Sequence, residues 1–325
     1  MSATVVVDVH LDAADWAEAR DAETLEGLTS TPKVLSPVWF YDERGSDLFD
    51  EITRLDEYYP TRAERAILSA HAGDIARLTG ASTLVELGSG ASDKTRLLIE
   101  AMLTECDLER FVPFDVSEQT LRAAAASLAV EYGLPVRAVV GDFHRHLSRI
   151  PRTGRRMIAF LGGTIGNFDP AQRRRFFGDL HSSMDPDEWF LLGADLVKDP
   201  ARLVAAYDDA SGVTAEFNRN ALWVLNRELD ADFDVETFEH VVRWKATESW
   251  IEMWLRSSRA QQVRVERLDL DLDIAEGEEI RTEISAKFTP DGLDAELARA
   301  GFAVEAVWTD PAGDFLLSLA RPSEA

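Results

Sequence analysis

The chain has 325 residues, of which 46% are hydrophobic, so it can bury a substantial core in one large domain with an insertion or in two domains. Its 34 Lys and Arg against 59 Asp and Glu give a net charge of -25, which argues against nucleic acid and membrane surfaces as partners. The single cysteine, Cys106, cannot form an internal disulfide, and neither an export signal nor a long apolar run is present. We therefore expect a cytoplasmic monomer acting on a small molecule.

The N-terminal part of the chain divides into two segments. Residues Ala3 to Leu28 predict an entry segment that ends in a helix around 13–27, to which the sequence assigns no role. The segment 32–64 packs aromatic residues among charges, and Ser46 is expected to cap a helix within it. Taken alone, Tyr41 and Tyr58 predict ordinary amphipathic core packing with their hydroxyls at the surface.

A glycine loop in residues 83–95, T-L-V-E-L-G-S-G-A-S-D-K-T, predicts a buried strand, a tight turn at Gly88 and Gly90, and a helix capped by Ser92. Such loops often bind nucleoside cofactors. A dinucleotide loop would need a third glycine where Asp93 stands, and Glu86 would repel a pyrophosphate. S-adenosylmethionine, which is cationic and carries no phosphate, suits this loop better. The loop by itself is equally consistent with a plain strand-to-helix turn.

Further short apolar strands alternate with helices after the loop, at 110–116, 136–140, 157–161 and 189–195. This alternation predicts an α/β fold with a parallel sheet, whose ligands bind at the carboxyl ends of the strands. Asp115 ends the second strand, where an acidic residue accepts hydrogen bonds from a cofactor ribose. Asp142 and Phe143 follow the third strand and can take an adenine amino group and ring face. The segment 162–167 follows the fourth.

The end of the chain predicts a helix from Pro290, a stop at Gly301, and two strands at 302–308 and 315–320. The segment 199–285 is therefore expected to be an insertion, and the alternating strand 268–274 within it predicts an antiparallel sheet of its own. We expect a Rossmann-like domain of residues 60–198 and 286–325, and a second α+β substrate-binding lobe of residues 1–59 and 199–285.

A family resemblance extends from about Gly27 to Leu319. The blocks that carry it, in order, are F-Y-D-E-R-G-S-D-L-F-D-E-I-T-R-L-D-E-Y-Y-P-T-R-A-E, V-E-L-G-S-G, L-G-G-T-I-G-N-F, A-Y-D-D-A-S-G-V-T-A-E-F-N-R-N, I-E-M-W-L and T-E-I-S-A-K-F. Together they resemble the L-histidine Nα-methyltransferases of ergothioneine biosynthesis, which have the class I methyltransferase fold. The resemblance implies three methyl transfers from S-adenosylmethionine to the α-amino group of free histidine, giving hercynine.

The resemblance also implies site residues. The cofactor positions are Tyr41, Gly88, Lys94, Asp115, Asp142 and Phe143, and the substrate positions are Tyr58, Gly162, Asn167, Tyr207, Met253, Glu283 and Ser285. Among these, Tyr41, Gly162 and Asn167 are expected to act on the reacting amine. Glu283 and Ser285 stand two apart, so an extended segment would present both to the imidazole ring. No metal is required, and the H-x-H at residues 144–146 is expected to be a solvated surface.

Two positions depart from the family pattern, because Gly163 stands where a serine is expected and Asp56 where a proline is expected. Three alternatives stay open. A nicotinamide oxidoreductase would need the missing third glycine, a non-catalytic module would bind S-adenosylmethionine without turnover, and a methyltransferase for another aromatic amino acid should lack Glu283.

Overall fold

The computed structural model describes residues 4–90, 94–143 and 145–323. The chain forms two compact units. Unit 1 comprises the chain up to Asp12, Pro60–Val197 and the chain from Phe288, and unit 2 comprises Ala13–Tyr59 and Lys198–Lys287. No helix in the described ranges is both long and apolar enough to cross a membrane.

Unit 1 is built on an eight-stranded sheet in the order β1-β5-β4-β3-β6-β7-β14-β13. Its strands are β1 (Val5–Val9), β3 (Thr83–Leu87), β4 (Arg110–Asp115), β5 (Val136–Val140), β6 (Arg156–Phe160), β7 (Trp189–Asp195), β13 (Phe302–Thr309) and β14 (Phe315–Pro322). Neighbouring strands from β1 to β7 are parallel, whereas β14 is antiparallel to both β7 and β13. The predicted parallel sheet with a reversed final hairpin is confirmed.

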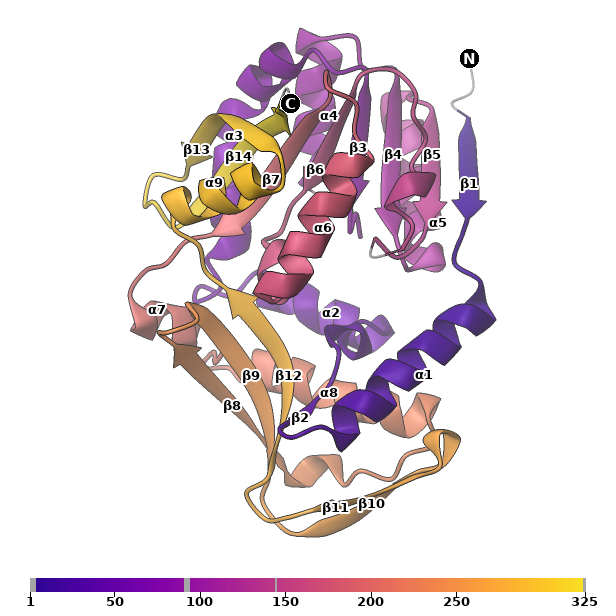
Figure 1. Cartoon of the computed structure of the whole chain (residues 1–325), viewed down its shortest axis with the longest axis vertical. Helices are drawn as coiled ribbons and strands as arrows, with labels where there is room; N and C mark the ends of the chain where they lie inside the picture. The colour runs from indigo at the N-terminus through magenta and orange to yellow at the C-terminus, as the bar shows by residue number, and fades with distance from the viewer. Residues whose placement is uncertain (1–3, 91–93, 144, 324–325) are drawn as a thin grey trace. The chain divides into compact units, whose positions relative to one another are not determined.

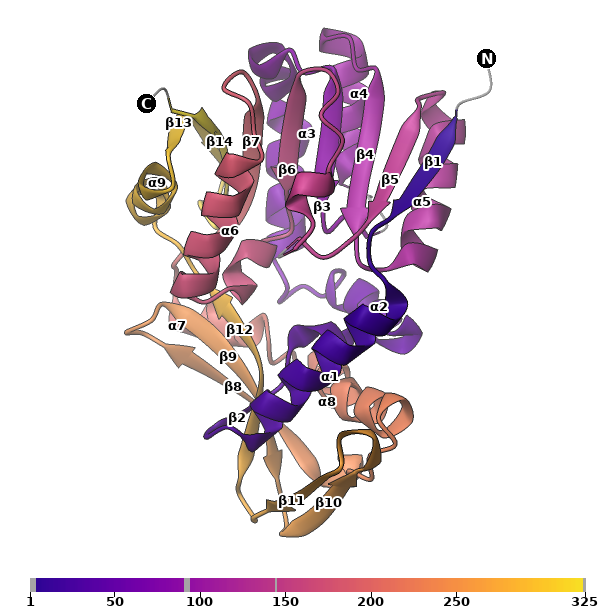
Figure 2. The same ribbon diagram turned by 45° about the vertical axis from the view of Figure 1, so that its right-hand side comes forward.

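Helices cover both faces of this sheet (Figure 2). One face carries α3 (Pro60–Thr79), α4 (Thr95–Glu105) and α5 (Glu118–Tyr132), and the other carries α6 (Pro170–Ser182) and α9 (Pro290–Arg299). Short 3-10 helices follow β5 and β6, namely η2 (Leu147–Arg149) and η3 (Thr164–Asn167). The sequence favours a helix start at α6, because Asp169 and Gln172 make a reciprocal capping box and Pro170 occupies the first helical position.

The start of the chain corrects one prediction. Residues 1–59 were expected to belong wholly to the second lobe, but β1 pairs in parallel with β5 at the edge of the large sheet. Its sequence, VVVDV, is rich in β-branched residues, which favour a strand. An ion pair between Asp8 and Arg137, 2.6 Å apart, joins the two strands. The first segment therefore extends the sheet of unit 1 before α1 (Ala13–Thr29) begins unit 2.

Unit 2 has a four-stranded sheet in the order β2-β12-β9-β8 and a separate hairpin of β10 and β11 (Figure 1). The strands are β2 (Lys33–Val34), β8 (Phe238–Lys245), β9 (Trp250–Ser257), β10 (Gln261–Val265), β11 (Leu270–Ile274) and β12 (Glu279–Ala286). Its helices are α1, α2 (Glu43–Ile52), α7 (Pro200–Ala205) and α8 (Val213–Glu228), with η1 (Pro37–Phe40), η4 (Val235–Thr237) and η5 (Glu266–Leu268) between them. The antiparallel pairing of β11 agrees with its alternating sequence.

Two helix starts differ from the sequence prediction. The N-cap of α2 is Asp42, whose carboxylate accepts a hydrogen bond from the Gly45 N–H at 2.7 Å, whereas Ser46 lies inside the helix. The helix after the glycine loop, α4, begins at Thr95. The predicted cap, Ser92, and its neighbour Asp93 lie outside the described residues.

Candidate active site

The glycine loop of unit 1 is held by the carboxylate that ends the next strand. Gly88 and Gly90 have φ values of +66° and +47°, and a Cβ at either position would meet no atom of the described residues within 4 Å. The Asp115 carboxylate accepts hydrogen bonds from the N–H groups of Gly90, at 3.0 Å, and Ser117, at 2.9 Å. Burial raises the pKa of Asp115, and these backbone donors oppose the rise. The loop therefore presents an open backbone surface next to a fixed acidic side chain.

Glu86, the acidic residue before the loop, has a structural role. Its buried carboxylate accepts hydrogen bonds from the hydroxyl groups of Ser89, at 2.8 Å, and Thr95. These bonds tie the loop to the first turn of α4. The charge that was expected to discourage phosphate is thus part of the support of the loop.

Asp142 and Phe143 lie where β5 ends, as the sequence predicts. Asp142 is buried, and its backbone N–H donates to Nδ1 of His146 at 3.1 Å. This assigns His146 of the H-x-H pair a capping contact, while His144 lies outside the described residues. The Phe143 ring packs beside those of Phe160 and Phe168, both at 5.7 Å between centroids. The carboxyl ends of β4 and β5 therefore offer a carboxylate pair and an aromatic surface.

The loop after β6 is organised by Glu64, a residue of α3 that sequence reasoning missed. Its fully buried carboxylate accepts hydrogen bonds from the Gly162 N–H, at 2.8 and 3.0 Å, and forms an ion pair with Lys94. Gly193 on β7 leaves the space that this carboxylate occupies. Two predicted site residues, Lys94 and Gly162, are thus brought together by a third. Glu64 could have been found from its helical spacing with the apolar Ile67 and Leu68.

Gly163, where a serine was expected, has a backbone conformation that favours glycine. Its φ is +70°, and it precedes η3, which ends at Asn167. A Cβ at this position would lie 3.4 Å from Cε2 of Phe315. The departure from the family pattern therefore relieves backbone strain in this loop.

In unit 2, the three tyrosines of the prediction lie along one row of aromatic rings. Tyr41 is 5.8 Å from Phe49, Phe49 is 6.3 Å from Tyr58, and Tyr58 is 6.2 Å from Tyr207, all in edge-to-face geometry. Tyr41 is 49% exposed, whereas Tyr58 and Tyr207 are buried. The row therefore begins at an exposed tyrosine and ends at two buried tyrosines.

Strand β12 presents the residues predicted for the imidazole ring. Glu283 lies opposite Met253 of β9, and Ser285 lies opposite Ile251. A β-bulge between Arg281 and Glu283 precedes them and resets the alternation of the strand. The Ser285 Oγ is 2.7 Å from the Tyr207 Oη, so β12 contacts the tyrosine row. Burial raises the pKa of Glu283 to about 7, although the Lys287 charge opposes the rise.

Lys287 is the second residue that sequence reasoning missed. Its Nζ donates to the Tyr207 Oη at 2.8 Å and to the Ser285 Oγ at 2.9 Å, and the side chain is only 4% exposed. It lies two positions beyond Ser285, just past the expected lobe boundary at residue 285, and belongs to unit 2. Extending the alternation of Glu283 and Ser285 by one step would have found it.

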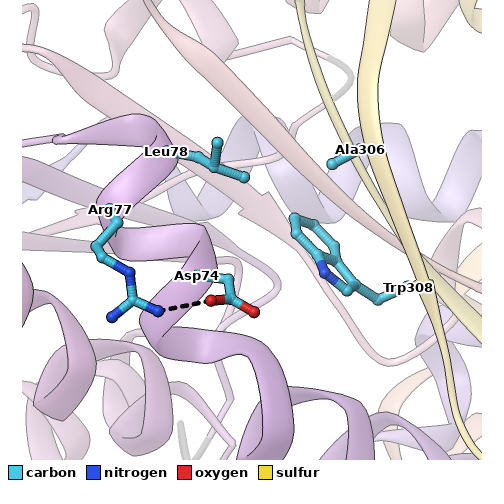
Figure 3. Close-up of a pocket in the computed structure, with 5 residues that line it drawn as sticks. All are labelled: Asp74, Arg77, Leu78, Ala306 and Trp308. Carbon is cyan, nitrogen blue, oxygen red and sulfur yellow. Dashed lines mark hydrogen bonds and ion pairs between the residues drawn. The ribbon is translucent and has the colours of Figure 1, made fainter.

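A surface pocket of unit 1 is lined by none of the residues predicted for the site (Figure 3). It is lined by Asp74, Arg77 and Leu78 of α3 and by Ala306 and Trp308 of the edge strand β13. Its charged groups pair with each other, since Arg77 donates to Asp74 at 2.6 Å. The pocket therefore presents an ion pair beside an indole.

The residues of unit 1 fit S-adenosylmethionine. The open backbone surface at Gly88 and Gly90 can accommodate a bulky ligand, and Asp115, Asp142 and Phe143 provide acceptors and a ring face for a nucleoside. Among the residues that the structure describes, no group of three or more His, Cys, Asp or Glu side chains is arranged to bind a metal ion.

The sequence of this chain is similar to those of known proteins. The family model described as "Histidine-specific methyltransferase, SAM-dependent" matches residues 20–322. The chain is 56% identical over 312 residues to the histidine N-alpha-methyltransferase of Mycolicibacterium smegmatis, covering 96% of this chain and 97% of that protein. It is also 56% identical over 319 residues to the enzyme of that name from Mycobacterium tuberculosis, covering 97% and 99%.

A more distant relative comes from a fungus. The chain is 32% identical over 222 residues to ergothioneine biosynthesis protein 1 of Neurospora crassa, covering 67% of this chain and 25% of that protein. With the family match over nearly its whole length, the sheet order of unit 1 and the loop that suits a cationic cofactor, the chain belongs to the histidine-specific, S-adenosylmethionine-dependent methyltransferases.

Proposed function

We propose that this enzyme trimethylates the α-amino group of free L-histidine, giving hercynine in the first step of ergothioneine biosynthesis. The observation that carries the proposal is the cluster in unit 2, where Tyr207, Ser285 and Glu283 combine hydroxyl groups with a partly buried carboxylate whose pKa is raised. Free histidine presents a carboxylate, an amine and an imidazole ring, and this cluster offers partners for more than one of them.

Each part of histidine has its own partners in this proposal. The hydroxyls of Tyr58 and Tyr207 and the side-chain amide of Asn167 bind the carboxylate. Glu283 and Ser285 bind the ring, against which Met253 packs; Met253 is buried on β9 opposite Glu283. The Gly162 carbonyl or the Tyr41 hydroxyl accepts hydrogen bonds from the amine and orients its lone pair.

Unit 1 holds the cofactor in this proposal, through Gly88, Lys94, Asp115, Asp142 and Phe143, and the family resemblance adds Tyr41 to the cofactor residues. When bound, S-adenosylmethionine supplies a methyl group on a positively charged sulfur. The chain supplies position: holding the amine in line with that methyl group can account for about 7–11 kcal/mol of the barrier in favourable cases. No covalent nucleophile of the protein is needed.

Mass spectrometry of the purified enzyme incubated with S-adenosylmethionine and a mixture of free amino acids tests the proposal. We expect histidine to be consumed, its α-nitrogen to carry all the added methyl groups, and about three S-adenosylhomocysteines to form per histidine, since a quaternary amine has no lone pair left for displacement. Methyl groups on the ring, or a persistent ratio near one, would reject it. Methylation of another aromatic amino acid in preference to histidine, or binding without turnover, would support the corresponding alternative.

The oligomeric state stays a prediction. We propose that the enzyme acts as a monomer. Light scattering of the purified protein that gave twice the mass of 36.2 kDa would reject this.

A further inference from the structure

The ammonium group of Lys287 determines how two hydroxyl groups of unit 2 can bind a ligand. An ammonium group donates hydrogen bonds and accepts none. The Tyr207 Oη, at 2.8 Å, and the Ser285 Oγ, at 2.9 Å, therefore both act as acceptors toward Lys287. Lys287 is only 4% exposed, so water cannot easily replace these hydrogen bonds if they are lost.

The two hydroxyls are also bonded to each other, with 2.7 Å between their oxygens. One of the two hydroxyl hydrogens lies in this bond, and the other points elsewhere. If Tyr207 donates to Ser285, the Ser285 hydroxyl can donate its own hydrogen to a ligand. If Ser285 donates to Tyr207, the Tyr207 hydroxyl can donate to a ligand instead. The directions of the two hydroxyls are thus coupled.

We propose that Lys287 is a positioning residue that couples recognition of the substrate carboxylate at Tyr207 to recognition of the imidazole ring at Ser285. The inference rests on the proposed function. If the Tyr207 phenol donates its hydrogen to a carboxylate, it must be the acceptor in its bond with Ser285. The Ser285 Oγ, which already accepts from Lys287, then uses its other lone pair to accept from a ring N–H.

The protonation state of the bound ring follows from this arrangement. An ionised Glu283 carboxylate only accepts hydrogen bonds, and in this arrangement Ser285 also accepts from the ring. Both ring nitrogens must then carry hydrogens, so histidine binds as the imidazolium beside the Glu283 carboxylate. An amino acid with an apolar ring would leave a buried carboxylate and a hydroxyl oxygen unpaired, which explains selectivity.

The surroundings of Glu283 make Lys287 the charge that acts on it. The neighbouring strand β9 places apolar residues on this face, with Met253 directly opposite Glu283. Lys33 of β2, the other neighbour, pairs with Glu278 at 2.8 Å. His240 of β8 lies on the same face as Met253, and burial lowers its pKa, which keeps it neutral at pH 7.

His240 also supports Tyr207. Its Nε2 lies 2.8 Å from the Tyr207 carbonyl oxygen, which can only accept, so Nε2 carries the hydrogen. Its Nδ1 then accepts from the Asn218 amide at 2.8 Å. The backbone and the hydroxyl of Tyr207 are therefore held from two directions, by His240 and by Lys287.

Binding measurements on Lys287→Met and Lys287→Gln test the proposal, with Lys245→Met, an exposed lysine of the same sheet, as the control. Histidine affinity is measured by calorimetry with S-adenosylhomocysteine present, and KM and kcat are measured alongside. We expect Lys287→Met to weaken histidine binding about tenfold or more and to raise KM more than it lowers kcat. Affinity for S-adenosylhomocysteine should stay within about twofold of wild type in all three variants.

Lys287→Gln separates hydrogen bonding from charge, because an amide can still donate to both hydroxyls. We expect Lys287→Gln to bind histidine more tightly than Lys287→Met. In both variants the acid limb of the pH profile of histidine binding should move to higher pH, because the pKa of Glu283 rises without the Lys287 charge. If Lys287→Met does not fold, Lys287→Gln alone carries the test by the same two measurements. Histidine affinity within about twofold of wild type, or an unmoved pH profile, overturns the proposal.

Nitrogen NMR of ring-labelled histidine bound to the wild-type complex is an independent test. Two nitrogens with the chemical shifts of an imidazolium are expected, and a nitrogen without a hydrogen would overturn the coupling. A failure of the proposed function has a different outcome, because wild-type enzyme would then neither bind nor methylate histidine.

Discussion

Unit 1 and unit 2 fix their polar site residues in different ways. In unit 1, two carboxylates accept hydrogen bonds from the backbone: Asp115 from Gly90 and Ser117, and Glu64 from Gly162. In unit 2, side chains bond to side chains, as in the cluster of Lys287, Tyr207 and Ser285. The first arrangement depends on where the chain turns, and the second on which side chains are present.

This difference explains how one fold can serve several substrates. A loop held through its N–H groups keeps its shape when neighbouring side chains change, so a nucleoside cofactor can be bound in a conserved manner by unrelated sequences. A cluster of side chains changes its donors and acceptors with a single substitution. We therefore expect substitutions in unit 1 to affect stability and cofactor binding, and substitutions in unit 2 to affect the choice of substrate.

The largest expected effect comes from removing Glu64, which supports the loop of unit 1. Glu64→Ala leaves the Gly162 N–H and the Lys94 ammonium without their buried acceptor, and breaking such a pair costs about 3 kcal/mol or more. Denaturant unfolding measures the loss. Glu118→Ala, which removes an exposed ion pair with Arg122, is the matched control and should cost about 1 kcal/mol or less. Equal effects of the two substitutions would show that Glu64 does not support the loop.

Removing Glu283 tests the other half of the comparison. Glu283→Ala should weaken histidine binding by about 10- to 150-fold, which corresponds to a charge-assisted hydrogen bond worth about 1.5–3 kcal/mol. Affinity for S-adenosylhomocysteine should not change, and discrimination against amino acids with apolar rings should fall. Calorimetry that found histidine affinity within about twofold of wild type would contradict the ring assignment and reopen the choice of substrate.

Asp115→Ala should weaken cofactor binding by about 1.5–3 kcal/mol, with substrate selectivity retained. Its carboxylate is bonded to the loop backbone, so part of this loss comes from a loosened loop rather than from a missing contact to the ribose. Asp115→Asn keeps an acceptor oxygen and should recover part of the affinity. Unchanged affinity for S-adenosylhomocysteine in Asp115→Ala, measured by calorimetry, would remove Asp115 from the cofactor site.

The pH dependence of stability provides a sharper test of Glu283. Its pKa in the folded state, about 7, is above the ordinary value of 4.5, so between these pH values the folded protein binds more protons than the unfolded chain. The contribution of Glu283 to stability therefore falls as pH rises from 4.5 to 7. Glu283→Gln should be more stable than wild type at pH 8 and should lose this advantage at pH 4.5, although it binds histidine less tightly. Thermal unfolding at the two pH values that gave the same difference would contradict the burial of this charge.

The sequence could predict the sheet of unit 1 because its strands are short apolar runs that end in glycine or a carboxylate. Gly88, Asp115 and Asp142 mark strand ends, and parallel strands place their carboxyl ends at one edge. The strand Val5–Val9 was missed, because the helix that follows it belongs to unit 2. The alternation of strand and helix that predicts the other strands of the sheet is therefore absent here. The substrate residues were assigned from the family resemblance rather than from periodicity.

The spacing of Glu64 and Lys287 in the sequence can place each on a buried face, but it cannot show what they contact, for a common physical reason. Each acts through a partner that is distant in the chain: Glu64 contacts residues 94 and 162, and Lys287 contacts residue 207. Glutamate and lysine are usually exposed, and a local pattern does not reveal that a particular one is buried with a partner. The fold had to be known before these two residues could be assigned a function.

The smallest expected effect concerns Gly163, one of the two positions where this chain departs from the family pattern. Gly163→Ser places a side chain at φ +70°, which costs about 1–2 kcal/mol for an L-residue, and its Cβ would lie 3.4 Å from the Phe315 ring. Gly178→Ser, in the middle of α6 with open space around its Cβ, is the matched control and should be neutral or slightly stabilising, because serine is a better helix former than glycine. Thermal unfolding should therefore separate two chemically identical substitutions by their backbone conformation alone. If Gly163→Ser were as stable as wild type, the backbone of this loop would change to accommodate a new side chain. The proposed difference between the backbone-held loops of unit 1 and the side-chain cluster of unit 2 would then be wrong for this loop. Histidine selectivity should be the same in both variants, since neither glycine belongs to the side-chain cluster that we propose for ring binding.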